Sequence, residues 1–177
     1  FDYKGEFSDI QNNHWLALFD VDRSCILDPL TQPLPFTPFK DFTERSINEI
    51  NLYSTEMSSA LYSIDRVSAS ANMNNRLSEA IVEAYKSTNG APISFELMLK
   101  CYQSRMKDAN NDDSISSVLK QLVNAHIFES EDKVSLIDDS YIIKMDGYPK
   151  DGPIAKAIVY FLMSKLNNIY ELWINKQ

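Results

Sequence analysis

Between residues 42 and 128, apolar side chains recur every three or four positions, the spacing of helices that bury one face. Thr43 is the expected N-cap of the first helix, and Ser94 the N-cap of the third. Asn89-Gly90 ends the second helix, and Asn110–Asp113 breaks the chain before the fourth. The apolar stripes are Ile47, Ile50, Tyr53, Met57, Ala60, Leu61 and Ile64; Met73, Leu77, Ala80, Ile81, Ala84 and Tyr85; Leu97, Met98, Cys101 and Tyr102; and Ile115, Val118, Leu119, Leu122 and Val123. Four such helices with short loops predict a compact bundle.

The region before the helices has the pattern of short β structure. Cys25–Leu27 is a good short strand that stops at Asp28-Pro29. Three prolines between Pro33 and Pro38 exclude both a helix interior and a central strand, so an extended connection must follow. Its Phe36 and Phe39 are expected to fix the connection to the core.

The region after the helices again has the pattern of short β structure. Val134–Ile137 and Tyr141–Met145 are predicted strands, separated by turn residues. Gly152-Pro153 then begins a long helix that runs to about Trp173. This helix is apolar almost all round over Ile158–Met163, which predicts that it is buried between layers. A strand, a turn and a long buried helix make half of a βαβ unit.

The predicted fold is therefore mainly α with α/β ends. A four-helix insertion bundle is attached to part of a β-sheet and to a long buried C-terminal helix. We place an α/β segment at 1–41, the helical insertion at 42–130, and the strands and long helix that rejoin the α/β core at 131–177.

Composition narrows the function classes. Of the 177 residues, 44% are hydrophobic and 24% charged, which is a globular balance. The net charge of −8 repels phosphate backbones, so the surface as a whole is not a nucleic-acid binder. No stretch reaches the roughly 20 apolar residues of a membrane helix, and no signal peptide is present, so we expect a cytoplasmic protein without a membrane partner.

No pattern in the chain predicts a metal site or a bound cofactor. Cys25 and Cys101 are far apart and form no CxxC pair, so they are expected to be free buried thiols. His14 and His126 have no second ligand at helical spacing. Asn111–Asp113 lacks the glycine and distal glutamate of a calcium loop and is expected to cap the fourth helix.

The positions of the glycines show whether the chain contains a phosphate-binding loop for nucleotide hydrolysis. A phosphate-binding loop has the pattern GxxxxGK[ST], whose backbone amides hold the phosphates. The four glycines are Gly5, Gly90, Gly147 and Gly152, and none is followed by Lys-Ser or Lys-Thr. The chain by itself is therefore not expected to be an ATPase.

The opening segment Phe1–Phe7 reads FDYKGEF and resembles the D-x-[HK]-G-E-[YF] segment of the HerA/FtsK-like P-loop ATPases. Two further segments follow in the order of that family. Ile26–Pro29, together with Pro35–Phe39, resembles its strand and N-P-F connection, with Thr37 in place of asparagine.

The last of these segments, Ile142–Pro149, reads IIKMDGYP and resembles the family's V-I-D-L-S-G-x-P strand before a long helix. Lys144 replaces the acidic residue of that motif, and Asp146 replaces the serine. The helical insertion between these landmarks also has a counterpart in the family. The resemblance covers nearly the whole chain, but each motif is short, and order and spacing carry it.

The resemblance implies that this chain is an internal piece of a bacterial DNA-translocating or restriction-associated ATPase. Walker A would lie before Phe1 and Walker B after Gln177, so ATP and Mg²⁺ belong to the parent. Asp2 and Glu6 would lie near the phosphates and the attacking water. The implied partners are the remainder of the parent polypeptide, further copies or restriction-complex proteins, and DNA through the parent.

Two alternatives do not use the resemblance. The chain can be a stand-alone helical protein-interaction domain without catalysis, in which Asp2 and Glu6 only serve a turn. The second to fourth helices, with Ile127-Phe128 and Val134–Leu136, also match a winged helix in outline. A DNA-reading winged helix should be basic, whereas the fourth helix carries only Lys120.

Overall fold

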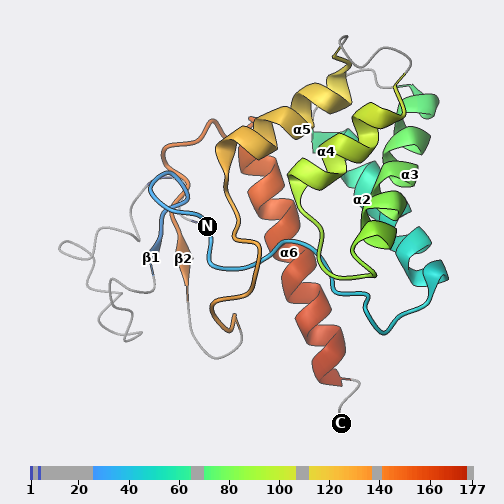
Figure 1. Ribbon diagram of the computed structural model, residues 1–177. Coiled ribbons are helices and arrows are strands. Elements are labelled where there is room, and N and C mark those ends of the chain that lie inside the picture. The colour runs from blue at the N-terminus through green and yellow to red at the C-terminus, as the bar shows by residue number, and fades with distance from the viewer. Residues whose placement is uncertain (2–3, 5–25, 65–69, 107–111, 137–140, 175–177) are drawn as a thin grey trace. The chain divides into compact units, whose positions relative to one another are not determined.

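The computed structural model describes residues 1, 4, 26–64, 70–106, 112–136 and 141–174, with side chains up to residue 170. Within these residues the protein is mainly helical, with a small two-stranded parallel sheet (Figure 1). The elements are β1 (Ile26–Leu27), α2 (Ile47–Ile64), α3 (Ala71–Ser87), α4 (Phe95–Ser104), α5 (Ser114–Ala125), β2 (Ile142–Ile143) and α6 (Pro153–Ile174).

The chain divides into two compact units. The helical unit is residues 39–125, and the terminal unit is residues 1–38 with 126–177. In the helical unit α2 packs against α3, α3 against α4, and α4 against α5. Most residues of the predicted stripes are buried in its core, but Ile47 is 45% exposed, and Ala60, Met73, Leu97 and Val123 are only half-buried. The fully buried large side chains of this core are Met57, Leu77, Ile81, Tyr85, Met98, Tyr102, Leu119 and Leu122.

Aromatic rings join the start of the helical unit to its helices. The ring of Phe42 lies 5.2 Å from that of Tyr53 and 5.0 Å from that of Tyr85. The hydroxyl of Tyr85 donates to the carbonyl of Lys40 at 3.1 Å. Burial raises the pKa of Tyr85 well above its usual range, because ionisation would leave a charge inside an apolar cluster.

The first helix begins later than predicted, so Thr43 as its N-cap is wrong. Ser46 and Glu49 form a reciprocal capping box, in which the Ser46 amide donates to Glu49 Oε2 at 3.0 Å and the Glu49 amide donates to Ser46 Oγ at 3.4 Å. This pair satisfies amides that the helix cannot. The cap at Ser94 is confirmed, since its Oγ accepts from the Leu97 amide at 3.2 Å.

The predicted stop at Asn89-Gly90 is also confirmed. Both residues have positive φ, 53° and 86°, and the Gly90 amide donates to the Tyr85 carbonyl at 2.8 Å. The Gly90 carbonyl accepts from the Phe42 amide at 2.7 Å. A Cβ at position 90 would lie 2.5 Å from the Phe42 carbonyl oxygen, so the turn requires glycine twice over.

A polar network centred on Asp113 ties three helices of this unit together. Its Oδ1 accepts from the Ser116 amide at 2.9 Å, which confirms the predicted cap of α5. Its Oδ2 accepts from the hydroxyl of Tyr102 on α4 at 2.7 Å and from Nη1 of Arg76 on α3 at 3.2 Å. The Arg76 guanidinium also lies 5.6 Å from the centre of the Tyr102 ring. Burial, followed by the Asp113 carboxylate, raises the pKa of Tyr102 above its ordinary range.

The terminal unit contains the parallel pair β1 and β2, with Ile26 opposite Ile142 and Leu27 opposite Ile143. The strand predicted at Val134–Ile137 is wrong over residues 134–136, which form no strand. A strand needs a partner, and the nearby backbone of Leu34 is already bridged to Phe128. The predicted wing of a winged helix is likewise not formed, since the described pairings at Phe128 and β2 are parallel.

The helix α6 begins at Pro153 as predicted but is not buried all round. Ile158 and Phe161 are fully buried, whereas Met163 is 55% exposed and Tyr170 59% exposed. The prediction that α6 is buried between layers is therefore wrong for the side of the helix that carries Met163 and Tyr170. Among the described residues, no helix combines the length and apolarity needed to cross a membrane. Cys101 is a buried free thiol, and Cys25 lies outside the described residues.

Asp113→Ala should lower the free energy of unfolding of the helical unit by about 2–3 kcal/mol. The change removes the α5 cap and leaves the Tyr102 hydroxyl and Arg76 guanidinium without their acceptor. The neighbouring Asp112→Ala is the matched control, because it removes an exposed pair with Lys120 and a long 3.4 Å hydrogen bond from the Ser116 hydroxyl, and it should cost under about 1 kcal/mol. Urea unfolding of both variants measures the difference, and equal losses would contradict the assigned role of Asp113.

Candidate functional site

The candidate site lies where the two parallel strands end. Parallel strands present their carboxyl ends at the same edge of a sheet, and this edge is where open α/β sheets bind ligands. Asp28 follows β1, and Lys144 follows β2 one position past the register pair Leu27–Ile143. The Lys144 amide donates to the Leu27 carbonyl at 2.9 Å, so Asp28 and Lys144 are placed side by side by the backbone.

Asp28 is held in place by the turn it begins. Its Oδ1 accepts from the Leu30 amide at 3.1 Å, and its carbonyl accepts from the amides of Thr31 and Gln32 at 3.0 and 3.1 Å. Pro29 cannot continue a strand ladder, so the local sequence ends β1 here. The carboxylate is therefore fixed at the strand end, with its side chain 22% exposed.

Lys144 lies between two carboxylates. Its Nζ is 3.5 Å from Asp28 Oδ2 and 3.9 Å from Asp146 Oδ1. These distances are those of ion pairs, and the partial exposure of all three groups limits each pair to about 0.2–1 kcal/mol. The ammonium occupies the space between the carboxylates, so the cluster carries one net negative charge.

Tyr148 belongs to the same cluster through its electrostatics. The segment from Met145 to Tyr148 forms a turn, in which the Tyr148 amide donates to the Met145 carbonyl at 3.1 Å. Burial raises the pKa of the Tyr148 hydroxyl above its ordinary value, and the negative charge of Asp28 raises it further. Tyr148 therefore stays a neutral hydroxyl at physiological pH and can donate a hydrogen bond.

The cluster offers one ammonium, two carboxylates and one phenol at a strand edge. These groups can bind a polar ligand, orient water or pair with a charged group of a neighbouring segment. Among the described residues, no group of three or more His, Cys, Asp or Glu side chains is arranged to hold a metal ion.

Asp2 and Glu6, the residues singled out by sequence, lie outside the described residues. Their place near this edge stays a prediction. The cluster of Asp28, Lys144 and Tyr148 was not predicted as a site. Only part of this site was indicated by the sequence: Asp28 directly follows the predicted strand Cys25–Leu27, whereas Lys144 lies inside the predicted strand Tyr141–Met145.

A second feature is a polar groove on the helical unit, with a volume of about 390 Å³. Arg105, at the end of α4, crosses to α3 and pairs with Glu79 at 3.1 Å and Glu83 at 2.8 Å. The two glutamates are one helical turn apart, which lets one guanidinium bind both. The groove is lined by Asn51, Thr55, Ser78, Glu79, Val82, Glu83, Lys86 and Arg105.

No protein-family model, curated protein or solved structure matches this chain.

We expect Asp28 and Lys144 to be energetically coupled across the strand pair. A double-mutant cycle of Asp28→Asn and Lys144→Met should give a coupling energy of about 0.5–1 kcal/mol, because each single change removes the same ion pair. Urea unfolding of the four proteins measures it. Asp28→Asn with Lys156→Met is the matched control and should be additive, since Lys156 has no ion pair among the described residues. Additivity of the first pair would refute the coupling.

Asp28→Asn should also lower the pKa of Tyr148 while leaving it above about 10, because the carboxylate is lost but burial remains. The unfolded chain ionises this tyrosine near its ordinary pKa. Its contribution to stability is therefore complete below about pH 10 and is lost as pH rises through the folded pKa. A pH titration of ¹³C-labelled tyrosine, assigned with Tyr148→Phe, measures the shift. No movement in Asp28→Asn would argue against the contact.

Proposed function

We propose that this chain supplies part of the α/β core and the helical insertion of a HerA/FtsK-like P-loop ATPase that acts on DNA. The supporting observation is the parallel pairing of β1 with β2. The segments that resemble the family's strand motifs, Ile26–Pro29 and Ile142–Pro149, are far apart in sequence yet lie next to each other in register. The long helix α6 follows the second of them, as the family's motif order requires.

In this proposal the nucleotide lies at the carboxyl edge of the sheet, and the phosphate loop comes from elsewhere in the parent polypeptide. ATP and Mg²⁺ are therefore ligands of the parent. Asp28 and Lys144 line that edge, and Lys144 supplies a positive charge where the family motif has a carboxylate. Glu6, with Asp2 beside it, orients the attacking water. Catalysis needs the assembled parent, because the chain has no GxxxxGK[ST] loop.

The helical unit serves contacts with neighbouring subunits or with partner proteins. It has its own core and its own caps. Hydrolysis between subunits would drive movement on DNA. Within the family, we propose that the parent is DptH, the large protein of the phosphorothioation-dependent restriction system, because the sequence pattern of this chain looks most like that protein.

The full-length parent should hydrolyse ATP, and Glu6→Gln should lower kcat by about 100- to 1000-fold, because the amide cannot act as a base toward water. Phosphate release measures the rate. Glu56→Gln, an exposed carboxylate on α2, is the matched control and should leave the rate unchanged. The 177-residue chain alone should show no turnover.

The outcomes separate the parts of the proposal. Unchanged turnover in Glu6→Gln would remove Glu6 from the mechanism but leave the ATPase in place. A parent without turnover and without a phosphate loop would remove the ATPase itself. The alternative is then a helical protein-interaction domain, which the polar groove around Arg105 favours because it is a formed concave surface on a self-contained unit.

A further inference from the structure

The two segments that lead into and out of the helical unit are hydrogen-bonded to each other inside the terminal unit. The Leu34 amide donates to the Ile127 carbonyl at 2.6 Å, and the Leu34 carbonyl accepts from the Glu129 amide at 3.0 Å. The Lys133 amide donates to the Pro35 carbonyl at 2.9 Å. The first two bonds form a single parallel bridge between Leu34 and Phe128, and the third is a separate loop contact. We call residues 34–37 and 127–133 the paired segments.

Apolar contacts join the paired segments to α6. Phe36 is fully buried, and its ring lies 5.7 Å from that of Phe128. The Phe128 ring in turn lies 5.8 Å from that of Phe161 on α6, in an edge-to-face arrangement. The segments and the helix therefore share one small core.

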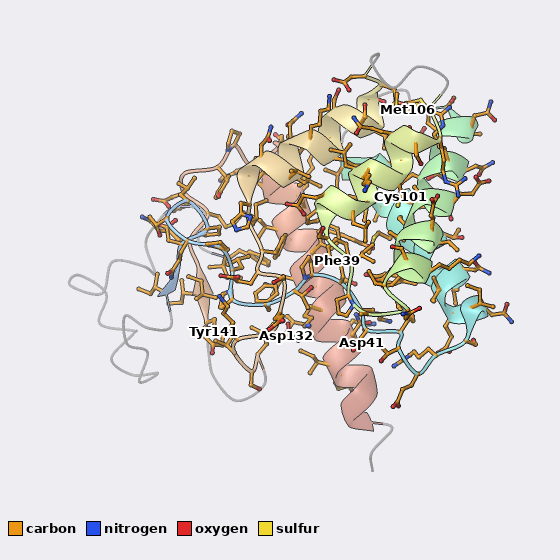
Figure 2. The ribbon with its side chains drawn as sticks, in the orientation of Figure 1. Phe39, Asp41, Cys101, Met106, Asp132 and Tyr141 are labelled. Atoms are coloured by element: carbon orange, nitrogen blue, oxygen red, sulfur yellow. The ribbon has the colours of Figure 1, made fainter. Side chains whose placement is uncertain are left out.

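Three hydrogen bonds complete the connection, and all of them are accepted by Asp132, which is labelled in Figure 2. Asp132 Oδ1 accepts from the Thr37 amide at 3.0 Å and from Lys165 Nζ at 2.8 Å. Its Oδ2 accepts from the same Nζ at 2.6 Å. A single carboxylate thus bonds the entering segment, the leaving segment that carries it, and α6.

The two groups that Asp132 binds are shielded from water, whereas its carboxylate is half exposed. The side chain of Lys165 is 14% exposed and Thr37 is 5% exposed, but the side chain of Asp132 is 47% exposed. Removing the carboxylate would take one partner from the Lys165 ammonium and one acceptor from the Thr37 amide, both in a poorly hydrated place. Water at the carboxylate screens part of the ion-pair attraction.

We propose that Asp132 and Lys165 form a latch that holds both connections of the helical unit on α6. While the latch is closed, the paired segments stay hydrogen-bonded to each other. When it opens, the two segments separate and exchange their amides with solvent. In the ATPase proposed above, a change in α6 would reach the helical insertion through this latch. That last step rests on the proposed function, whereas the latch itself does not.

Hydrogen exchange of the 177-residue chain, without nucleotide, tests the latch. Lys165→Met should raise the exchange rates of the Leu34, Glu129 and Lys133 amides by about 10-fold, although the lysine contacts none of them. Amides in α3, on the helical unit, should keep their rates. Lys156→Met is the matched control on the same helix, because Lys156 has no ion pair among the described residues, and it should change neither set.

Two further variants separate a latch from a general loss of stability. Lys165→Arg keeps the positive charge and should restore slow exchange. Asp132→Asn keeps an acceptor for the Thr37 amide but loses the charge, so it should behave like Lys165→Met. Unchanged exchange in Lys165→Met, or an equal rise in α3, would overturn the proposal. Because no nucleotide is present, this result is independent of whether the parent hydrolyses ATP.

Discussion

Two parallel strands cannot be joined by a tight turn, and this constraint organises the whole chain. The segment after β1 must travel to the opposite end of the pair before β2 can begin, which requires a long crossing connection. Here that connection contains the complete helical unit of residues 39–125. The pairing of Ile26–Leu27 with Ile142–Ile143 therefore places the helices as an insertion, and it also brings Asp28 and Lys144 to one edge.

The helical unit can be inserted between the two strands because it forms its own core and its own helix caps. Its helices begin at their own caps and bury one continuous apolar core. Asp113 shows how closely these tasks are combined, since one carboxylate caps α5 and also bonds α3 and α4. At the other boundary, Asp132 plays a comparable part for the terminal unit, where it bonds an entering segment and α6. In both places a carboxylate joins elements that are distant in sequence.

The candidate site follows from the backbone more than from side-chain chemistry. Asp28 and Lys144 are ordinary surface residues when the sequence is inspected, and only the register of the strands makes them neighbours. Their partial exposure keeps the interaction weak, which suits an edge where a ligand or another segment must compete for the same groups. The predicted pair Asp2 and Glu6 depended on a family motif, and it remains a prediction.

The sequence by itself determined the elements whose causes are local. Helical periodicity located the four helices, Ser94 and Asp113 showed where two of them begin, and Asn89-Gly90 showed where one ends, because these effects act within one turn of the backbone. The start of α2 was missed although the Ser46 capping box was visible in the sequence.

Tertiary structure decided the features that depend on a distant partner. Residues 134–136 have strand-like composition but form no strand, and α6 is apolar almost all round over Ile158–Met163 although Met163 is exposed. Pairing and burial belong to the assembled chain, so no local pattern could supply them.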